Sequence, residues 1–252
     1  MTASPVLSAS GLSKMFGAAR VTNGVDFALH PGDRRALIGP NGAGKTTLVN
    51  LLSGRLAPTS GTIRLGGADV TALSERARIK RGVGRTFQIT SLFPGLTVRQ
   101  NVTLAVAEHE GIGGAVFRPL FARRAVAERV EELLGRLRLG ADADATVSRM
   151  PYGKQRLVEI AMALALKPSV LLLDEPAAGI PSGESGIILD LIDRLPRHIA
   201  VLLIDHDMEL VFRFATAITV LVQGAVFREG TPAAIKADPA VRSVYLGEES
   251  HG

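Results

Sequence analysis

Eight consecutive residues place the strongest constraint on how this 252-residue chain can fold. They are Gly39, Pro40, Asn41, Gly42, Ala43, Gly44, Lys45 and Thr46. A short apolar run at 35–39 leads into them, and 45–52 has a helical pattern that ends at Gly54. Glycines let backbone N–H groups point into a concavity, and a helix that begins there directs its positive dipole end at the same point. The sequence therefore predicts a strand, an anion-binding turn and a helix in succession.

The pattern G-x-x-x-x-G-K-[ST] indicates that the anion is a nucleoside triphosphate. We expect the Lys45 ammonium to reach the β- and γ-phosphates, and the Thr46 hydroxyl to ligate the Mg²⁺ that bridges them. Thr47 is predicted to belong to the same nucleotide site. A glycine-rich turn without a ligand is the alternative, and the flanking strand and helix disfavour it.

Two carboxylates follow a second apolar run, at 170–173. Open α/β sheets place their ligand chemistry at the carboxyl ends of strands. We expect Asp174 to hold the Mg²⁺ shell and Glu175 to orient and deprotonate the attacking water. Taken alone, two acids in this place more often mark a strand end that meets solvent. The phosphate-binding turn elsewhere in the chain favours a catalytic role for them.

His206 follows the next apolar run, at 200–204, so it should lie at the same sheet edge. It is a candidate contact for the γ-phosphate. An isolated histidine in this place is more often an ordinary strand-end residue.

Strand and helix patterns alternate along the chain, which predicts an α/β fold. Strand patterns vanish between 89 and 150, and we expect a helical lobe inserted there. Within it, one helical stripe over 123–139 joins Val126, Val130, Leu133, Leu134 and Leu137. Further patterns predict a strand at 62–65, a helix at 155–166, and a hairpin of 218–222 with 225–228 around Gln223-Gly224. The hairpin predicts a mixed sheet.

Composition narrows the environment and the partners. The chain has no cysteine, which excludes disulfides and fits a cytoplasmic protein. No apolar run reaches the length of about 20 residues that spans a bilayer, and the first ten residues lack the pattern of a secretion signal. The net charge of +5 comes from scattered residues, which favours a solvated surface over nucleic-acid binding.

The motifs in this order resemble those of an ABC-transporter ATPase over nearly the whole chain. The segment 85–88 resembles the Q-loop, whose glutamine, Gln88, would touch Mg²⁺ and the nucleotide site. The segment 150–154, with Tyr152 and Gly153, stands at the place of the signature motif, and 203–207 resembles the H-loop. Phe16 is placed to stack on adenine, with Phe27 as the alternative and a core role open for either.

This resemblance implies an α/β P-loop NTPase core with a mixed, largely parallel sheet, an antiparallel β-subdomain and an inserted helical subdomain. We expect the core at 1–88 and 156–252 and the helical and signature subdomain at 89–155. ATP and Mg²⁺ would be the cofactors, and two transmembrane permease subunits and a second ATPase subunit the partners. The protein would lie on the cytoplasmic face of the membrane, with 89–101 as the contact to the permeases.

Segments at 151–153, 174–179, 230–232 and 245–247 look most like the branched-chain amino-acid importers, which implies a solute-binding protein that delivers cargo. Two positions depart from the usual pattern. Pro151 replaces the signature serine, and Pro181 replaces the usual aspartate of the D-loop. The site built with this signature should be weaker, which favours a nonidentical second ATPase subunit over a homodimer.

Other functions stay open at this point. Urea or short amides and aromatic acids are alternative cargoes, because this subunit does not touch the cargo. A soluble ABC ATPase that acts on ribosomes or DNA would usually carry two cassettes or a long coiled-coil insertion, and neither occurs here. A GTP-dependent switch would need an Asn-Lys-x-Asp motif, which the sequence lacks.

Overall fold

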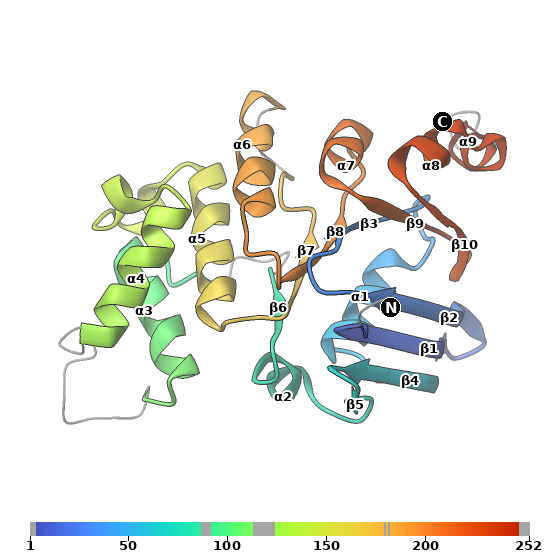
Figure 1. Ribbon diagram of the computed structural model, residues 1–252, viewed down its shortest axis with the longest axis horizontal. Coiled ribbons are helices and arrows are strands. Elements are labelled where there is room, and N and C mark those ends of the chain that lie inside the picture. Colours follow the sequence, from blue (N-terminus) through green and yellow to red (C-terminus); the bar gives the residue numbers. More distant parts are fainter. Residues whose placement is uncertain (1–3, 87–91, 113–123, 179, 181, 247–252) are drawn as a thin grey trace. The chain divides into compact units, whose positions relative to one another are not determined.

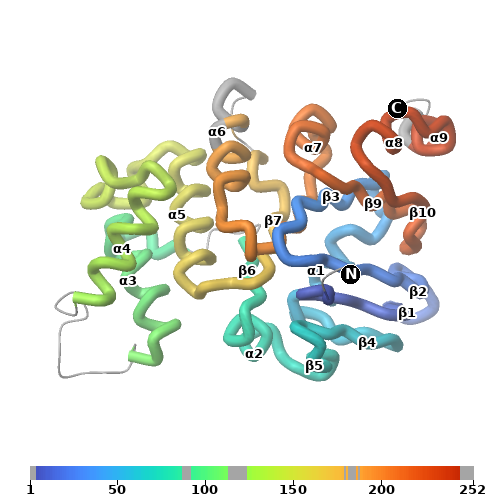
Figure 2. Tube along the Cα trace, viewed as in Figure 1, coloured from blue at the N-terminus to red at the C-terminus, as the bar shows by residue number. Residues whose placement is uncertain are grey.

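The computed structural model describes residues 4–86, 92–112, 124–178, 180 and 182–246 (Figures 1 and 2). The chain forms two compact units. The first comprises Met1–Val83, Ser169–Glu175 and Pro196–Gly252, and the second comprises Gly84–Pro168 and Pro176–Leu195. The helical unit thus extends beyond the expected span 89–155 on both sides and includes a separate segment. The subdomain bounds expected from the sequence stay a prediction.

An antiparallel sheet of four strands belongs to the first unit, in the order β2-β1-β4-β5 (Figure 1). Its strands are β1 (Leu7–Phe16), β2 (Ala19–Leu29), β4 (Ser60–Leu65) and β5 (Ala68–Asp69). Inward-facing apolar residues alternate with exposed ones along β4, as expected for a sheet with one buried face. This sheet is the antiparallel β-subdomain that the sequence predicts.

The second sheet has six strands in the order β10-β9-β3-β8-β7-β6. They are β3 (Arg34–Ile38), β6 (Val83–Arg85), β7 (Val170–Asp174), β8 (Ala200–Ile204), β9 (Ala217–Val222) and β10 (Ala225–Gly230). β7 and β8 are buried at every position, as parallel strands covered on both faces should be. β3 runs parallel to β8 and β9, while β9 and β10 form the antiparallel hairpin around Gln223 and Gly224. The predicted mixed, largely parallel sheet is confirmed.

One hydrophobic core joins the two sheets of the first unit. Leu7, Leu12 and Ile63 come from the antiparallel sheet, and Leu37 and Leu202 from the parallel one. Helix α1 (Lys45–Ser53) buries Leu48, Val49, Leu51 and Leu52 in the same core. This packing fixes the first residue of α1, and with it the phosphate-binding turn, on a rigid base. The unit also contains α2 (Glu75–Ile79), α7 (Met208–Phe214), α8 (Pro232–Ala237) and α9 (Pro239–Leu246).

The second unit is helical, as predicted. It contains α3 (Val98–His109), α4 (Arg124–Arg136), α5 (Tyr152–Ala165) and α6 (Ser182–Asp193) (Figure 2). α3 packs against both α4 and α5. All five residues of the predicted stripe on α4 and just beyond it are buried. A capping box of Thr97 and Gln100 fixes the start of α3.

Within the part of the chain that the structure describes, no helix combines the length and the apolar character that a membrane span requires.

Candidate active site

The turn between β3 and α1 has a backbone that only glycine supports well. Gly42 and Gly44 have φ angles of +76° and +95°. A Cβ atom on Gly44 would lie 2.6 Å from the carbonyl oxygen of Val21, and one on Gly39 would collide with the carbonyl oxygen of Leu221. The turn is therefore pressed closely against β2 and β9. Both conformation and space require glycine at positions 39 and 44, and conformation alone favours it at Gly42.

The Lys45 ammonium lies over this turn and donates to the carbonyl oxygens of Gly39 and Pro40, at 2.6 and 2.9 Å. Gly44 is the N-cap of α1 and offers no side chain to the first-turn amides. Those amides and the dipole of α1 point at the same place as the ammonium. Thr46, Thr47 and Lys45 are in this first turn, so the predicted phosphate-binding residues are brought together.

Strand register brings the second motif to the same sheet edge. Asp174 of β7 and Leu37 of β3 are both paired with Ile204 of β8, which lies between them. Adjacent strands are about 4.8 Å apart, so the ends of β3 and β7 lie about 10 Å apart. A triphosphate on the turn after β3 can reach the side chains that follow β7.

Glu175 has a left-handed backbone, with φ of +46°, which is uncommon for a residue with a side chain. Its N–H donates to the carbonyl oxygen of Ile204 at 2.8 Å. This bond ties the residue after β7 to the end of β8 and holds it in the strained conformation. Such strain is concentrated at functional sites.

His206 lies at the sheet edge where the sequence predicts it, and the structure places it next to Glu175. Its Nδ1 is 3.3 Å from Oε1 of Glu175, and its side chain is 75% exposed. An exposed imidazole at a sheet edge can contact a ligand there, because no packing encloses it. The pair places a carboxylate and an imidazole together at the carboxyl ends of β7 and β8.

Asp205 is a site residue that the sequence analysis did not single out. Its carboxylate is buried and accepts the backbone N–H groups of His206 and Asp207, at 2.8 and 3.0 Å. Burial raises the pKa of Asp205, and these hydrogen bonds oppose the rise. Asp205 thus holds the backbone that presents His206. Its place directly after an apolar strand and before His206 is the signal that could have identified it.

The oxygen atoms at this edge fit a hard cation better than a transition metal. Thr46 provides a hydroxyl and Asp174 a carboxylate that is 2% exposed. Among the described residues, no group of three or more His, Cys, Asp or Glu side chains could hold a metal ion. Mg²⁺ is commonly bound through one or two carboxylates together with substrate phosphates, so the donor set fits it.

The two aromatic candidates for adenine stacking differ in exposure. Phe27 is 4% exposed and belongs to the hydrophobic core, with the Arg35 guanidinium 5.4 Å from its ring centroid. Phe16 ends β1 and is 48% exposed, with the Lys14 ammonium 5.2 Å from its ring centroid. Phe27 therefore has the core role, and Phe16 stays the candidate for adenine.

The signature segment belongs to the helical unit. Tyr152 and Gly153 begin α5, and Pro151 is the N-cap, which provides no side-chain hydrogen bond. Lys154, in the first turn of α5, is paired with Asp142 at 2.7 Å. Two further predicted positions, Gln88 and Pro181, lie outside the described residues.

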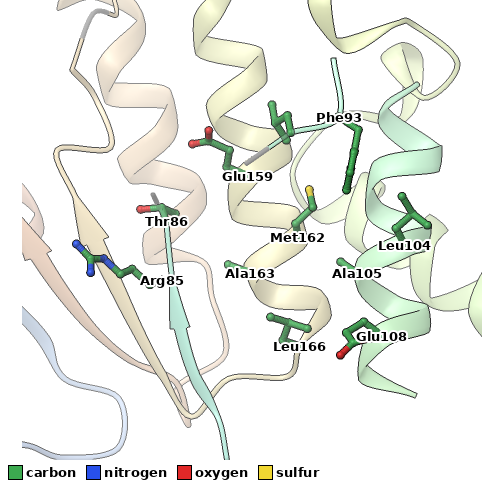
Figure 3. A pocket seen from close by; sticks show the side chains of 11 residues that line it. Arg85, Thr86, Phe93, Leu104, Ala105, Glu108, Glu159, Met162, Ala163 and Leu166 are labelled. Carbon is green, nitrogen blue, oxygen red and sulfur yellow. The ribbon is translucent and has the colours of Figure 1, made fainter. Parts of the chain in front are cut away.

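The helical unit also has an apolar groove, with a cavity of about 360 Å³. Its apolar lining comes from Leu92, Phe93, Leu104, Met162, Ala163 and Leu166 (Figure 3). Phe93 and Leu104 are 51% and 37% exposed. Leu92 and Phe93 lie in the span 89–101 that the sequence predicts as the permease contact, whereas Leu104 of α3 and Met162 of α5 lie outside it.

Family models and curated relatives agree on what this chain is similar to. A model described as "ABC transporter" matches residues 22–178, and one described as "Branched-chain amino acid ATP-binding cassette transporter" matches residues 229–251. The high-affinity branched-chain amino acid transport ATP-binding protein LivG of Escherichia coli K12 is 40% identical, over 97% of this chain and 98% of LivG. The protein BraF of Pseudomonas aeruginosa, with the same description, is 38% identical over 97% of this chain and 98% of BraF.

A solved structure has the same fold. The ADP conformation of an ATP-binding cassette of an ABC transporter superposes with a TM-score of 0.82 at 28% identity, over 96% of this chain and 99% of that one. The chain belongs to the ABC transporter family, among the ATP-binding subunits of its branched-chain amino acid group.

Proposed function

We propose that this chain hydrolyses ATP with Glu175 as general base, and so drives an importer of branched-chain amino acids. The arrangement that carries the proposal is the convergence of Lys45, Asp174, Glu175 and His206 on the carboxyl edge of one sheet. The cargo is inferred from the descriptions of LivG and BraF, which are similar over nearly their full lengths.

In the proposed reaction the first-turn amides of α1 and the Lys45 ammonium hold the triphosphate. Glu175 orients a water and accepts its proton as the water oxygen attacks the γ-phosphorus. The bond between this phosphorus and the β–γ bridging oxygen breaks, and ADP leaves with the electron pair. His206 contacts the γ-phosphate and stays fixed through the backbone that Asp205 holds.

Thr46, Asp174 and Gln88 are the residues proposed to hold Mg²⁺. When bound, the ion would offset negative charge that develops on the phosphate oxygens.

The proposed assembly contains a second ATPase subunit, which we expect to be nonidentical. In this arrangement Tyr152 and Gly153 act on the nucleotide held by the partner, and the partner's signature acts on the nucleotide held here. Pro151 brings no hydroxyl to that contact, so the site built with this signature is the weaker one. Mixing the two purified subunits should raise ATP turnover above that of this chain alone, and equal turnover would contradict a nonidentical pair.

The groove lined by Phe93, Leu104 and Met162 is the surface through which we propose that this chain contacts one of the two permease subunits. Exposed apolar side chains in one concave area are typical of interaction sites. The chain would then lie on the cytoplasmic face of the membrane, and a solute-binding protein would act on the other side without touching it. No nucleic acid takes part.

Uptake of labelled leucine by cells tests the proposal. Cells that lack this chain should regain uptake with the parent and should not regain it with Glu175→Gln at equal expression. Urea, a short amide and an aromatic acid are measured beside leucine. Restored uptake of one of these without leucine would correct the cargo, and uptake of leucine with Glu175→Gln would contradict the motor role.

A further inference from the structure

One buried carboxylate in the groove of the helical unit has an unused oxygen. Glu159 lies on α5 and lines the same pocket as Leu104 and Met162 (Figure 3). Its side chain is 4% exposed, and its Oε2 accepts a hydrogen bond from the Arg156 guanidinium at 2.7 Å. Its Oε1 has no hydrogen-bond partner among the described residues. A buried acceptor without a partner is costly.

A second buried oxygen without a hydrogen-bond partner lines the same pocket. The hydroxyl oxygen of Thr86 is buried and has no hydrogen-bond partner within the described part of the chain. Arg85 also lines the pocket, and it does not hydrogen-bond to Oε1 of Glu159. The groove therefore combines exposed apolar side chains with two buried oxygen atoms that lack hydrogen-bond partners, and the carboxylate oxygen of Glu159 requires a donor from elsewhere.

An occupant with apolar atoms alone would bury Glu159 further and would donate no hydrogen bond to its Oε1. A carboxylate in low dielectric is stabilised by a cation that also donates a hydrogen bond. Burial raises the pKa of Glu159, and the Arg156 guanidinium opposes the rise. A second cation would act in the same direction as Arg156, which favours an occupant with a basic side chain.

We propose that the groove binds an apolar helix of a permease subunit that carries one basic side chain, and that this side chain donates to Oε1 of Glu159. The inference rests on the proposed motor function, in which the groove receives the permease. In this proposal, Glu159 is the residue of this chain that selects the partner. Phe93 and Leu104 provide the apolar contact. Glu159 provides a negative charge that pairs with the basic side chain, so a helix without a cation binds less tightly.

A pair of stapled helical peptides tests the inference on the full chain. Both have about 14 residues with apolar side chains on one face, and they differ in one position, which is arginine or the neutral citrulline. Binding is measured by fluorescence anisotropy. On the parent chain, the arginine peptide should bind at least about tenfold more tightly than the citrulline peptide. Equal affinities, or no binding of either peptide, would overturn the proposal.

Two variants identify the partner of the arginine. Glu159→Gln should reduce the preference for the arginine peptide to within about twofold. Glu108→Gln, which changes another carboxylate that lines the groove, should keep the tenfold preference. Loss of the preference in Glu108→Gln, or its retention in Glu159→Gln, would overturn the assignment to Glu159. If Glu159→Gln does not fold, the comparison of the two peptides on the parent still decides whether the groove selects a cation.

ATP turnover, measured on the same preparations, keeps the two proposals apart. A parent chain without turnover would contradict the motor function while the peptide preference stands. Turnover with no peptide preference would overturn only the inference about the groove.

Discussion

The sheet edge of the first unit and the groove of the second differ in how sequence builds them. At the sheet edge, each functional group lies close after a strand: Lys45 begins α1 after the turn that follows β3, Glu175 comes directly after β7, and His206 is two residues beyond β8. In the groove, the lining comes from the segment before α3, from α3 itself and from α5. Short local motifs thus specify the sheet edge, whereas the groove, which is the proposed docking surface, depends on how the helices pack.

The largest effect is expected for a buried ion pair of the helical unit. Arg156 and Glu159 have side chains that are 5% and 4% exposed, so removal of one leaves a buried charge. Glu159→Ala should lower the free energy of unfolding by about 3–5 kcal/mol, measured by urea denaturation. Glu128→Ala removes half of an exposed pair on α4 and should cost less than about 1 kcal/mol. Equal losses in the two variants would show that the buried pair of Arg156 and Glu159 contributes no more to stability than an exposed pair.

A loss of nucleotide affinity is expected next, at the sheet edge. Lys45→Ala removes a charge-assisted contact to phosphate, worth about 1.5–3 kcal/mol, so the Kd for ATP should rise about 10- to 150-fold. Lys167→Ala changes a lysine of the helical unit that is 54% exposed, and its Kd should match that of the parent. Titration with a fluorescent ATP analogue measures both. An unchanged Kd in Lys45→Ala would contradict the assignment of this turn as the phosphate-binding site.

A smaller change in ATP affinity is expected at Phe16, and it separates the two aromatic residues. Phe16→Ala should weaken ATP binding by about 1 kcal/mol, or about fivefold, because stacking on a base is lost. Phe27→Ala should instead lower the free energy of unfolding by about 3 kcal/mol, since it leaves a cavity in the core. Affinity and urea denaturation are measured on both variants. An unchanged Kd in Phe16→Ala would leave adenine recognition to other residues.

The smallest effect is a change in pH dependence at Asp205. Burial raises its folded-state pKa above the ordinary value of 3.8, so the stability that the protonated carboxyl contributes is lost as pH rises through the raised pKa. Asp205→Asn keeps an oxygen acceptor for the backbone of His206 and removes this loss. The free energy of unfolding of the variant, relative to the parent, should therefore increase between pH 4 and neutral pH. A difference in the free energy of unfolding between variant and parent that stays constant over this range would contradict a raised pKa of Asp205.

Much of the fold and of the catalytic edge could be predicted from the sequence, because strands and turns there have local signals. Fully apolar runs identified β7 and β8, and Gln223-Gly224 identified the hairpin. The left-handed backbone of Glu175 could not be predicted, since it depends on the bond to Ile204 across the sheet. The groove around Glu159 could not be predicted either, because α3 and α5 meet only in the folded unit.

The exposure of Phe16 and the burial of Phe27 show the same limit. Both residues precede the phosphate-binding turn and belong to one hairpin, so their spacing left the choice open. Tertiary packing decided it, because the inner face of β2 carries Phe27 into the core.

Nucleotide binding and phosphate release, measured together on Glu175→Gln, test the central claim most directly. The variant keeps the phosphate-binding turn and loses the base, so we expect an ATP affinity within about twofold of the parent and a turnover about 10²- to 10⁴-fold lower. That combination would establish Glu175 as the residue that activates water. Turnover close to that of the parent, with ATP bound at the same site, would contradict it.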